Sequence, residues 1–132
     1  MKNYTELLVE DKKQKVKFVE TLKIAEGVEC DVYIFPDDAS KDLAIVRIVK
    51  GSKSPRQKVI DGERTLQIYV SGEGKLVVEK PDESRKIYQT PVEKTVEVKI
   101  GEIMQWFAKS DLVYYEICYP PYKDGRYINL PE

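Results

Sequence analysis

The chain has 132 residues, 42% of them hydrophobic and 34% charged, which is enough apolar material for one compact domain over residues 1–132. Its 22 Lys and Arg residues nearly balance 23 Asp and Glu residues, so no basic field is available to hold a nucleic acid backbone. Histidine is absent, which excludes an imidazole base and a histidine-ligated metal. No segment approaches the roughly 18 apolar residues of a membrane span, and we expect a cytoplasmic protein.

Alternation of apolar and polar residues with period two predicts short β-strands from the start of the chain. Residues 15–24 and 28–35 form the predicted N-terminal strands, and the turn-forming residues 36–38 end the second one. Residues 43–50 predict a strand with apolar side chains on both faces, as in a strand buried inside a sandwich or barrel. Arg47 is the one misfit in this strand.

Turn residues divide the following part of the chain into further strands. We expect strands at 56–60 and 65–70, joined by Asp61-Gly62 as a two-residue hairpin turn. The glycines of residues 71–74 form a tight turn into the next strand. The remaining predicted strands are 75–79, 92–100, 103–107 and 112–119. The C-terminal tail, residues 120–132, has little periodicity. Many short strands without a helical repeat predict an all-β sandwich or barrel of jelly-roll type.

Two segments within about residues 43–119 resemble the cupin superfamily, whose members are double-stranded β-helix barrels. Residues 62–76 resemble the second half of the first cupin motif, because their strand ends in a Tyr-Val-x-Gly-x-Gly turn. Residues 100–107, followed by 111–117, resemble the second motif, in which a Gly-acidic pair opens a strand and a second strand returns. The resemblance implies a cupin-like jelly-roll barrel with a cavity between its two sheets.

The chain departs from the cupin motifs at the metal ligands. Cupins that bind metal carry His-x-His and a Glu on the first motif and another His on the second. Alignment through the 71–74 turn puts these ligands near residues 58–61, Thr65 and Leu112, none of which is a histidine. We therefore expect a member that lacks the metal-ligand histidines, with no metal and no cofactor. The alternative oxygen ligands are Asp61, Glu63 and Glu116.

Strand alternation and the resemblance together select candidate site residues. Polar side chains share one face of residues 65–70, and Tyr114 and Glu116 share one face of the last strand. Because Thr65 and Leu112 stand where inward ligands stand in cupins, the resemblance implies that these faces look into the barrel. The candidate ligand-binding residues are Arg47, Lys58, Gln67, Tyr69, Trp106, Tyr114 and Glu116.

Each candidate also has a structural interpretation. Arg47 and Glu116 form either a buried salt bridge or part of a ligand site, and a strand register shifted by one residue would turn them to solvent. Trp106 is either a core or interface aromatic or a stacking platform for a ring. Lys58, in a basic cluster at the expected cavity mouth, either binds an anion or lies on a solvated face.

Three functions are compatible with these residues. The leading hypothesis is a metal-free domain that binds a small metabolite, a sugar or a small carboxylate, in the barrel cavity. The first alternative is a cofactor-independent sugar isomerase or epimerase in which Glu116 and a tyrosine such as Tyr114 act as acid and base. The second alternative is a structural or interaction module that binds no small ligand.

Assembly and the cysteines complete the expectations. Outward apolar residues and open sheet edges favour a homodimer in which residues 15–24 add to or pack across the partner's sheet. In the monomeric alternative, the same residues fold back on their own barrel. Cys30 and Cys118 lie outside any Cys-x-x-Cys spacing, so we predict two buried free thiols.

Overall fold

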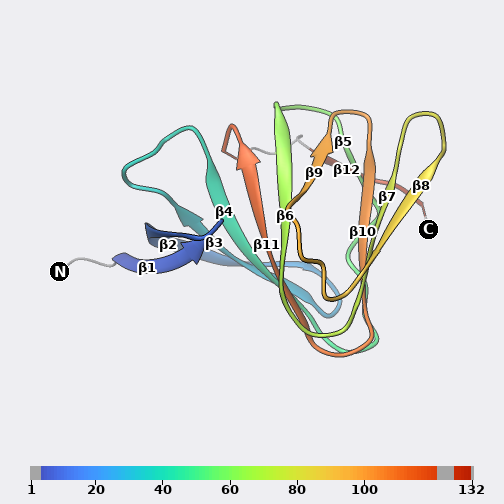
Figure 1. Ribbon diagram of the computed structural model, residues 1–132, viewed down its shortest axis with the longest axis horizontal. Helices are drawn as coiled ribbons and strands as arrows, with labels where there is room; N and C mark the ends of the chain where they lie inside the picture. Colours follow the sequence, from blue (N-terminus) through green and yellow to red (C-terminus); the bar gives the residue numbers. More distant parts are fainter. Residues whose placement is uncertain (1–3, 122–126, 132) are drawn as a thin grey trace.

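The computed structural model describes residues 4–121 and 127–131, and within these ranges it contains strands and no helix (Figure 1). One sheet has seven strands in the order β1 (Tyr4–Val9), β2 (Lys12–Ala25), β3 (Val28–Ile34), β4 (Asp42–Ile48), β11 (Leu112–Tyr119), β6 (Arg64–Ser71) and β9 (Val96–Lys99). The other has five in the order β12 (Tyr127–Asn129), β5 (Gln57–Val59), β10 (Ile103–Ala108), β7 (Gly74–Glu79) and β8 (Arg85–Gln89). The predicted all-β class is confirmed. The described residues include no helix that could cross a membrane.

The main hydrophobic core lies between the two sheets, which face each other as two layers in Figure 1. Ile48 of β4 and Leu112 of β11 enter this core from the seven-stranded sheet. Leu76 of β7 and Trp106 of β10 meet them from the five-stranded sheet. All pairings within both sheets are antiparallel, so each strand sends alternate side chains into the core.

A second hydrophobic cluster lies on the outer face of the seven-stranded sheet. Leu43, Leu66 and Ile117 occupy the positions of β4, β6 and β11 that alternate with those of the main core. Val9 and Val16, from the hairpin of β1 and β2, are fully buried in the same cluster. The sheet therefore curls until its N-terminal hairpin packs on its own outer face.

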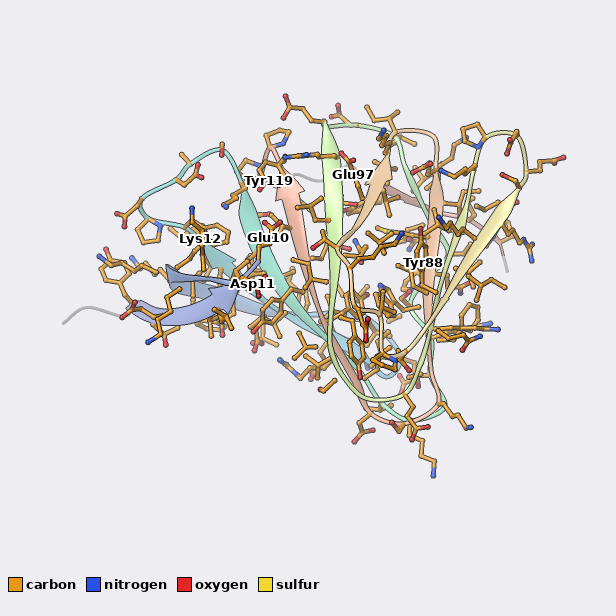
Figure 2. All side chains as sticks on the ribbon, viewed as in Figure 1. Glu10, Asp11, Lys12, Tyr88, Glu97 and Tyr119 are labelled. Carbon is orange, nitrogen blue, oxygen red and sulfur yellow. The ribbon has the colours of Figure 1, made fainter. Side chains whose placement is uncertain are left out.

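The turn between β1 and β2 explains why sequence patterning does not predict β1. Val9 pairs with Lys12, which leaves Glu10 and Asp11 as a two-residue loop, labelled in Figure 2. Both residues have positive φ angles, 51° and 64°. Two-residue hairpins with this geometry usually carry Asn-Gly or Asp-Gly, and the sequence Glu-Asp gives no such signal.

Two predicted turns join strands in a way that the sequence does not reveal. The hairpin predicted at Asp61-Gly62 is wrong, because β5 and β6 belong to different sheets and the chain crosses between them. The glycine turn likewise leads from β6 in one sheet to β7 in the other. There, a Cβ on Gly72 or Gly74 would overlap the backbone carbonyl oxygen of Asp111 or Phe107, so both positions require glycine for close backbone approach. Hairpins are therefore not separable from sheet crossings by turn residues alone.

Candidate functional site

A partly enclosed cavity of about 110 Å³ lies between the two sheets. Its apolar wall consists of Leu22, Ile24, Val28, Val32, Leu43, Ala44, Val46 and Pro55. Its polar lining consists of Cys30, Asp42, Ser54, Gln57, Tyr114, Glu116, Cys118 and Tyr127. Strands β2, β3, β4 and β11 supply one side, and β5, β12 and the loop before β5 supply the other. Larger hollows beside the loop 108–111 and beneath the β2–β3 turn are more open and lie nearer the surface.

Strand register brings the inner side chains of β11 to this cavity. Glu116 lies opposite Gln67 of β6 on one side and Ala44 of β4 on the other. Tyr114 lies opposite Val46, and Cys118 lies opposite Asp42. Residues directly opposite each other share a face of the sheet, so all of these side chains are directed between the layers. An uninterrupted β4–β11 pairing therefore fixes the cavity's most polar wall.

A chain of hydrogen bonds leads from the main core to the cavity. Trp106 Nε1 donates to Gln67 Oε1 at 3.0 Å, and Gln67 Nε2 donates to Glu116 Oε2 at 2.9 Å. On the cavity side, the Tyr127 hydroxyl donates to Glu116 Oε1 at 3.3 Å. The Trp106 ring also stacks on the Tyr114 ring, with centroids 4.4 Å apart and planes at 15°. Both carboxylate oxygens of Glu116 are thus oriented by neighbours from other strands, which holds the group in one position.

Burial and nearby negative charge keep the Cys30 thiol and the Tyr114 phenol protonated. Burial, reinforced by the negative charge of Glu116, raises the pKa of Cys30 from 9.0 to about 11. The same two causes raise the pKa of Tyr114 well above its usual value of 10.0. At neutral pH, Cys30 is therefore not a nucleophilic thiolate, and Tyr114 can donate a hydrogen bond but cannot act as a base.

Two predicted site residues point away from the cavity. Arg47 lies opposite Val113, on the outer face of the sheet, where its guanidinium contacts Asp31 at 2.7 Å and Glu29 at 3.6 Å. The predicted inward Arg47, and with it a salt bridge to Glu116, is wrong. Both faces of β4 are largely apolar, so its sequence did not indicate which face is internal.

Lys58 also lies outside the cavity, because successive side chains of β5 point to opposite faces of the sheet. Its neighbour Gln57 lines the cavity and its neighbour Val59 is fully buried in the main core. Lys58 therefore lies on the opposite face of β5, and the prediction that it stands at the cavity is wrong. No cationic side chain of the described residues lines the cavity.

Three other candidates support the cavity without lining it. Gln67 is buried, with 1% exposure, and bridges Trp106 to Glu116. Trp106 lies behind Tyr114 as a core aromatic, which matches its structural interpretation. Tyr69 packs against the main core and donates its hydroxyl hydrogen to the carbonyl oxygen of Gly72. Only Tyr114 and Glu116 among the predicted candidates line the cavity directly.

Sequence reasoning missed several lining residues. Cys30 and Cys118 are buried and form no disulfide, as predicted, but both also line the cavity. Cys118 shares the alternating face of Tyr114 and Glu116, so its position could be inferred from the same pattern. Tyr127 could not be found this way, because β12 is too short to show a period.

The positions implied for metal ligands do not meet in the fold. Thr65 lies opposite Cys118, at the far end of β11 from Leu112. Over residues 4–121 and 127–131, no three Cys, Asp or Glu side chains are grouped to hold a metal ion. The donor set of these residues therefore does not fit a metal centre.

The chain is similar to known proteins in its structure and not in its sequence. The sequence matches no protein-family model and no curated protein. A variant of Bacillus subtilis oxalate decarboxylase has a TM-score of 0.68 and 18% identity, over 85% of this chain and 30% of that one. Oxalate decarboxylase from Lactobacillus farciminis, in its formate complex, has a TM-score of 0.67 and 17% identity, over 87% of this chain and 33% of that one.

The capsular polysaccharide assembling protein CapF from Staphylococcus aureus is similar to the same degree. Its TM-score is 0.68 at 10% identity, over 89% of this chain and 32% of that one. This chain thus spans about a third of the length of each of these proteins. They are cupin-fold proteins, and the predicted cupin-like barrel is confirmed. At these identities the likeness shows the fold alone.

Proposed function

We propose that this cupin-fold domain binds a small molecule in the cavity between its sheets. The observation that carries the proposal is the cavity of about 110 Å³, lined by an apolar wall and by the oriented carboxylate of Glu116. Binding sites for small molecules are typically concave and mostly apolar, with a few fixed polar groups that orient the ligand. Glu116 is such a group, because hydrogen bonds from Gln67 of β6 and Tyr127 of β12 hold its carboxylate in place.

The sugars and small carboxylates expected from the sequence form part of the set of compounds to be tested. Purified protein is screened by thermal denaturation against small sugars, carboxylates, alcohols and amines. A ligand at about ten times its Kd adds about 1.4 kcal/mol to the free energy of unfolding, which raises Tm by roughly 5 °C for a chain of this size. We expect at least one class of compound to reach this shift.

A cavity-filling variant distinguishes internal binding from surface binding. Ala44 lines the cavity from the centre of the sheet, so Ala44→Leu fills part of the space that the ligand occupies. Val70→Leu is the matched control, because Val70 is 43% exposed and lies outside the cavity. The stabilisation should disappear in Ala44→Leu and persist in Val70→Leu. If no compound stabilises the wild type, or if Ala44→Leu responds equally, the proposal fails.

A further inference from the structure

The outer face of the five-stranded sheet carries apolar side chains that point away from the main core. Strands β7, β8 and β10 direct Leu76, Tyr88 and Trp106 toward the core, so the alternate residues of each strand lie on the opposite face. The apolar residues among them are Val77, Ile87, Ile103 and Phe107. Ile87 is 53% exposed. The described part of the chain consists of strands without a helix, so no helix of these residues covers this face (Figure 1).

Basic side chains dominate the charge of the same outer face. Lys58, Lys75 and Arg85 are outward cations of its strands, and within residues 4–121 and 127–131 none of the three forms an ion pair. Arg56 extends over the sheet from the loop before β5 and donates to Glu79 at 2.8 Å. Glu79 is the one carboxylate among the outward residues of the five strands. The face is therefore basic, although the whole chain has a formal net charge of -1.

The side chains of this face form three rows that run across the strands, because residues in register lie side by side. The first row consists of Ile128, Lys58, Ile103, Glu79 and Arg85. The middle row consists of Gln105, Val77 and Ile87. The third row consists of Phe107, Lys75 and Gln89. An apolar pair, Val77 and Ile87, thus lies between two rows that contain cations.

A hollow of about 160 Å³ lies on this face, and residues of all three rows line it. The first and third rows are four residues apart along β7, which corresponds to roughly 13 Å at the rise of a strand. An α-helix with its side chains is roughly 10 to 12 Å wide, so a helix that crosses the strands fits between these rows. From β5 to β8 the rows span roughly 14 Å, which is the length of about ten helical residues.

We propose that the outer face of the five-stranded sheet binds an acidic amphipathic α-helix of a partner protein. The apolar side chains of that helix enter the hollow at Val77 and Ile87. Its carboxylates lie on both flanks, where they meet Lys58 and Arg85 in one row and Lys75 in the other. Charge complementarity selects an acidic partner, and the hollow between the rows fits a convex helix better than a planar bilayer. This face lies outside the cavity, so the inference is independent of the proposed function.

A synthetic peptide of about 14 residues serves as the probe, which is long enough to span the rows as a helix. It carries leucine on one helical face, glutamate on both flanks and a fluorescein label, and its binding to the full chain is measured by fluorescence anisotropy. The control peptide has lysine in place of every glutamate. We expect the acidic peptide to bind with a Kd on the order of 10 to 100 μM and the lysine peptide to bind at least about tenfold more weakly. The affinity of the acidic peptide should fall severalfold at high salt.

Two pairs of substitutions locate the charges that bind the peptide. Lys58→Gln combined with Arg85→Gln removes two cations of the outer face, and we expect the affinity to fall about fivefold. Lys12→Gln combined with Lys13→Gln removes two exposed cations of β2, where Lys12 is labelled in Figure 2, and should leave the affinity unchanged. The comparison of the two peptides on the wild type decides the matter should the first variant not fold.

Two apolar substitutions test the contribution of the middle row. Ile87→Ser removes an aliphatic side chain at the hollow, so the affinity of the acidic peptide should fall severalfold. Leu8→Ser is the matched control, because Leu8 of β1 is 62% exposed and lies in the other sheet. Equal losses in both variants would overturn the assignment of the hollow as the helix site.

The remaining outcomes distinguish the acidic helix from other occupants. The proposal is wrong if the acidic peptide does not bind at about 1 mM, if the lysine peptide binds as tightly, or if the Lys58 and Arg85 substitutions have no effect. Vesicles of phosphatidylserine and phosphatidylcholine that bind the chain through Lys58 and Arg85, without binding of the peptide, would make the face a membrane-binding surface instead. A change of mass in light scattering caused by these substitutions would assign the face to a second copy of the chain, which also overturns the proposal.

Discussion

The reactivity of the Cys30 thiol depends on its burial and on the negative charge in the cavity. Its pKa is raised from the ordinary value of 9.0 to about 11, so at pH 8 the thiolate fraction is about 100-fold smaller than in an unfolded chain. We predict that iodoacetamide alkylates Cys30 in a Cys118→Ala variant at least 100-fold more slowly when folded than in urea. Mass spectrometry of timed samples measures both rates.

The Glu116→Gln variant provides the control for the cause of this slow reaction. Removing the carboxylate removes one of the two main causes of the raised pKa of Cys30, so the thiol should react faster. Glu97→Gln removes a carboxylate of β9 that lies outside the cavity, and it should not change the rate. Equal rates in folded and unfolded protein would show that the thiol is neither buried nor exposed to the charge of Glu116.

Arg47 acts at the surface of the sheet and not in the cavity. Its guanidinium donates two hydrogen bonds to Asp31, at 2.7 and 3.2 Å. These bonds, helped by one from Thr21, hold the pKa of Asp31 below its ordinary value of 3.8. A depressed carboxyl pKa gives stability that is present above the unfolded value and lost as the pH falls through the folded value.

We predict that Asp31→Asn lowers the free energy of unfolding by about 0.5 to 1 kcal/mol at pH 7, the usual range for a partly exposed ion pair. The difference from wild type should decrease below about pH 4, as measured by urea denaturation at a series of pH values. Asp37→Asn, in the exposed turn after β3, is the matched control and should have little effect. A difference that persists unchanged at pH 2 would contradict the assigned ion pair.

At the scale of elements, the turn from β1 to β2 carries strain that its sequence does not relieve. Non-glycine residues in the left-handed region cost of order 1 kcal/mol each, and Glu10 and Asp11 both have positive φ angles. Asn and Gly adopt this conformation more readily. We predict that Glu10→Asn combined with Asp11→Gly raises the free energy of unfolding by about 1 kcal/mol in urea denaturation. A less stable variant would show that the turn has another geometry.

Period-two patterning predicted most strands because each sends alternate side chains into a hydrophobic cluster. It missed β1, whose turn lacks glycine and asparagine, β8, whose five residues are mostly exposed, and β12, which has only three residues. It also predicted a hairpin at Asp61-Gly62 where the chain changes sheets, because turn residues carry no information about which strand pairs with which. Non-local pairing decides that choice.

The same limits explain what could be predicted of the site. Alternation put Tyr114 and Glu116 on one face of β11, and the resemblance to cupins implied that this face is internal, where the structure has both side chains. The polar face of β6 is the internal one, and its apolar face is covered in part by the second cluster. Arg47 was misplaced because neither face of β4 is polar enough to identify the outside. The opposite charges of Asp31 and Glu29 on the adjacent strand would have indicated the outer face, had the β3–β4 pairing been known.

In the part of the chain that the structure describes, the N-terminal hairpin leaves part of one edge of the seven-stranded sheet open. Over the described residues, which begin at Tyr4, β1 pairs with β2 up to Lys17, and the later residues of β2 pair on one side with β3. Phe18 and Val19 are about half exposed at this place. β1 and the first part of β2 pack on the outer face of their own sheet, and the homodimer expected from the sequence stays a prediction. We propose that the open edge after Lys17 pairs with the same edge of a second copy.

We predict a mass near that of two chains in light scattering at micromolar concentration. A lysine on an edge strand opposes pairing between sheets, so Val19→Lys should yield the mass of one chain. Ile87→Lys introduces the same charge on β8, at the edge of the other sheet, and should remain dimeric. A wild-type mass of one chain would rule out the homodimer, and an unaffected Val19→Lys dimer would place the contact elsewhere.

The alternating side chains of β4 enter two different hydrophobic clusters, Leu43 on the outer face and Val46 and Ile48 on the inner face. The same strand thus contributes to both clusters, and we expect the two clusters to open together. Amide hydrogen exchange should then show one slowest group spanning β4 and β11, with a single opening free energy. A molecule that binds in the inner cavity should then also slow the exchange of amides beneath the outer cluster. Binding inside the barrel would in this way be measurable on the opposite face of the sheet.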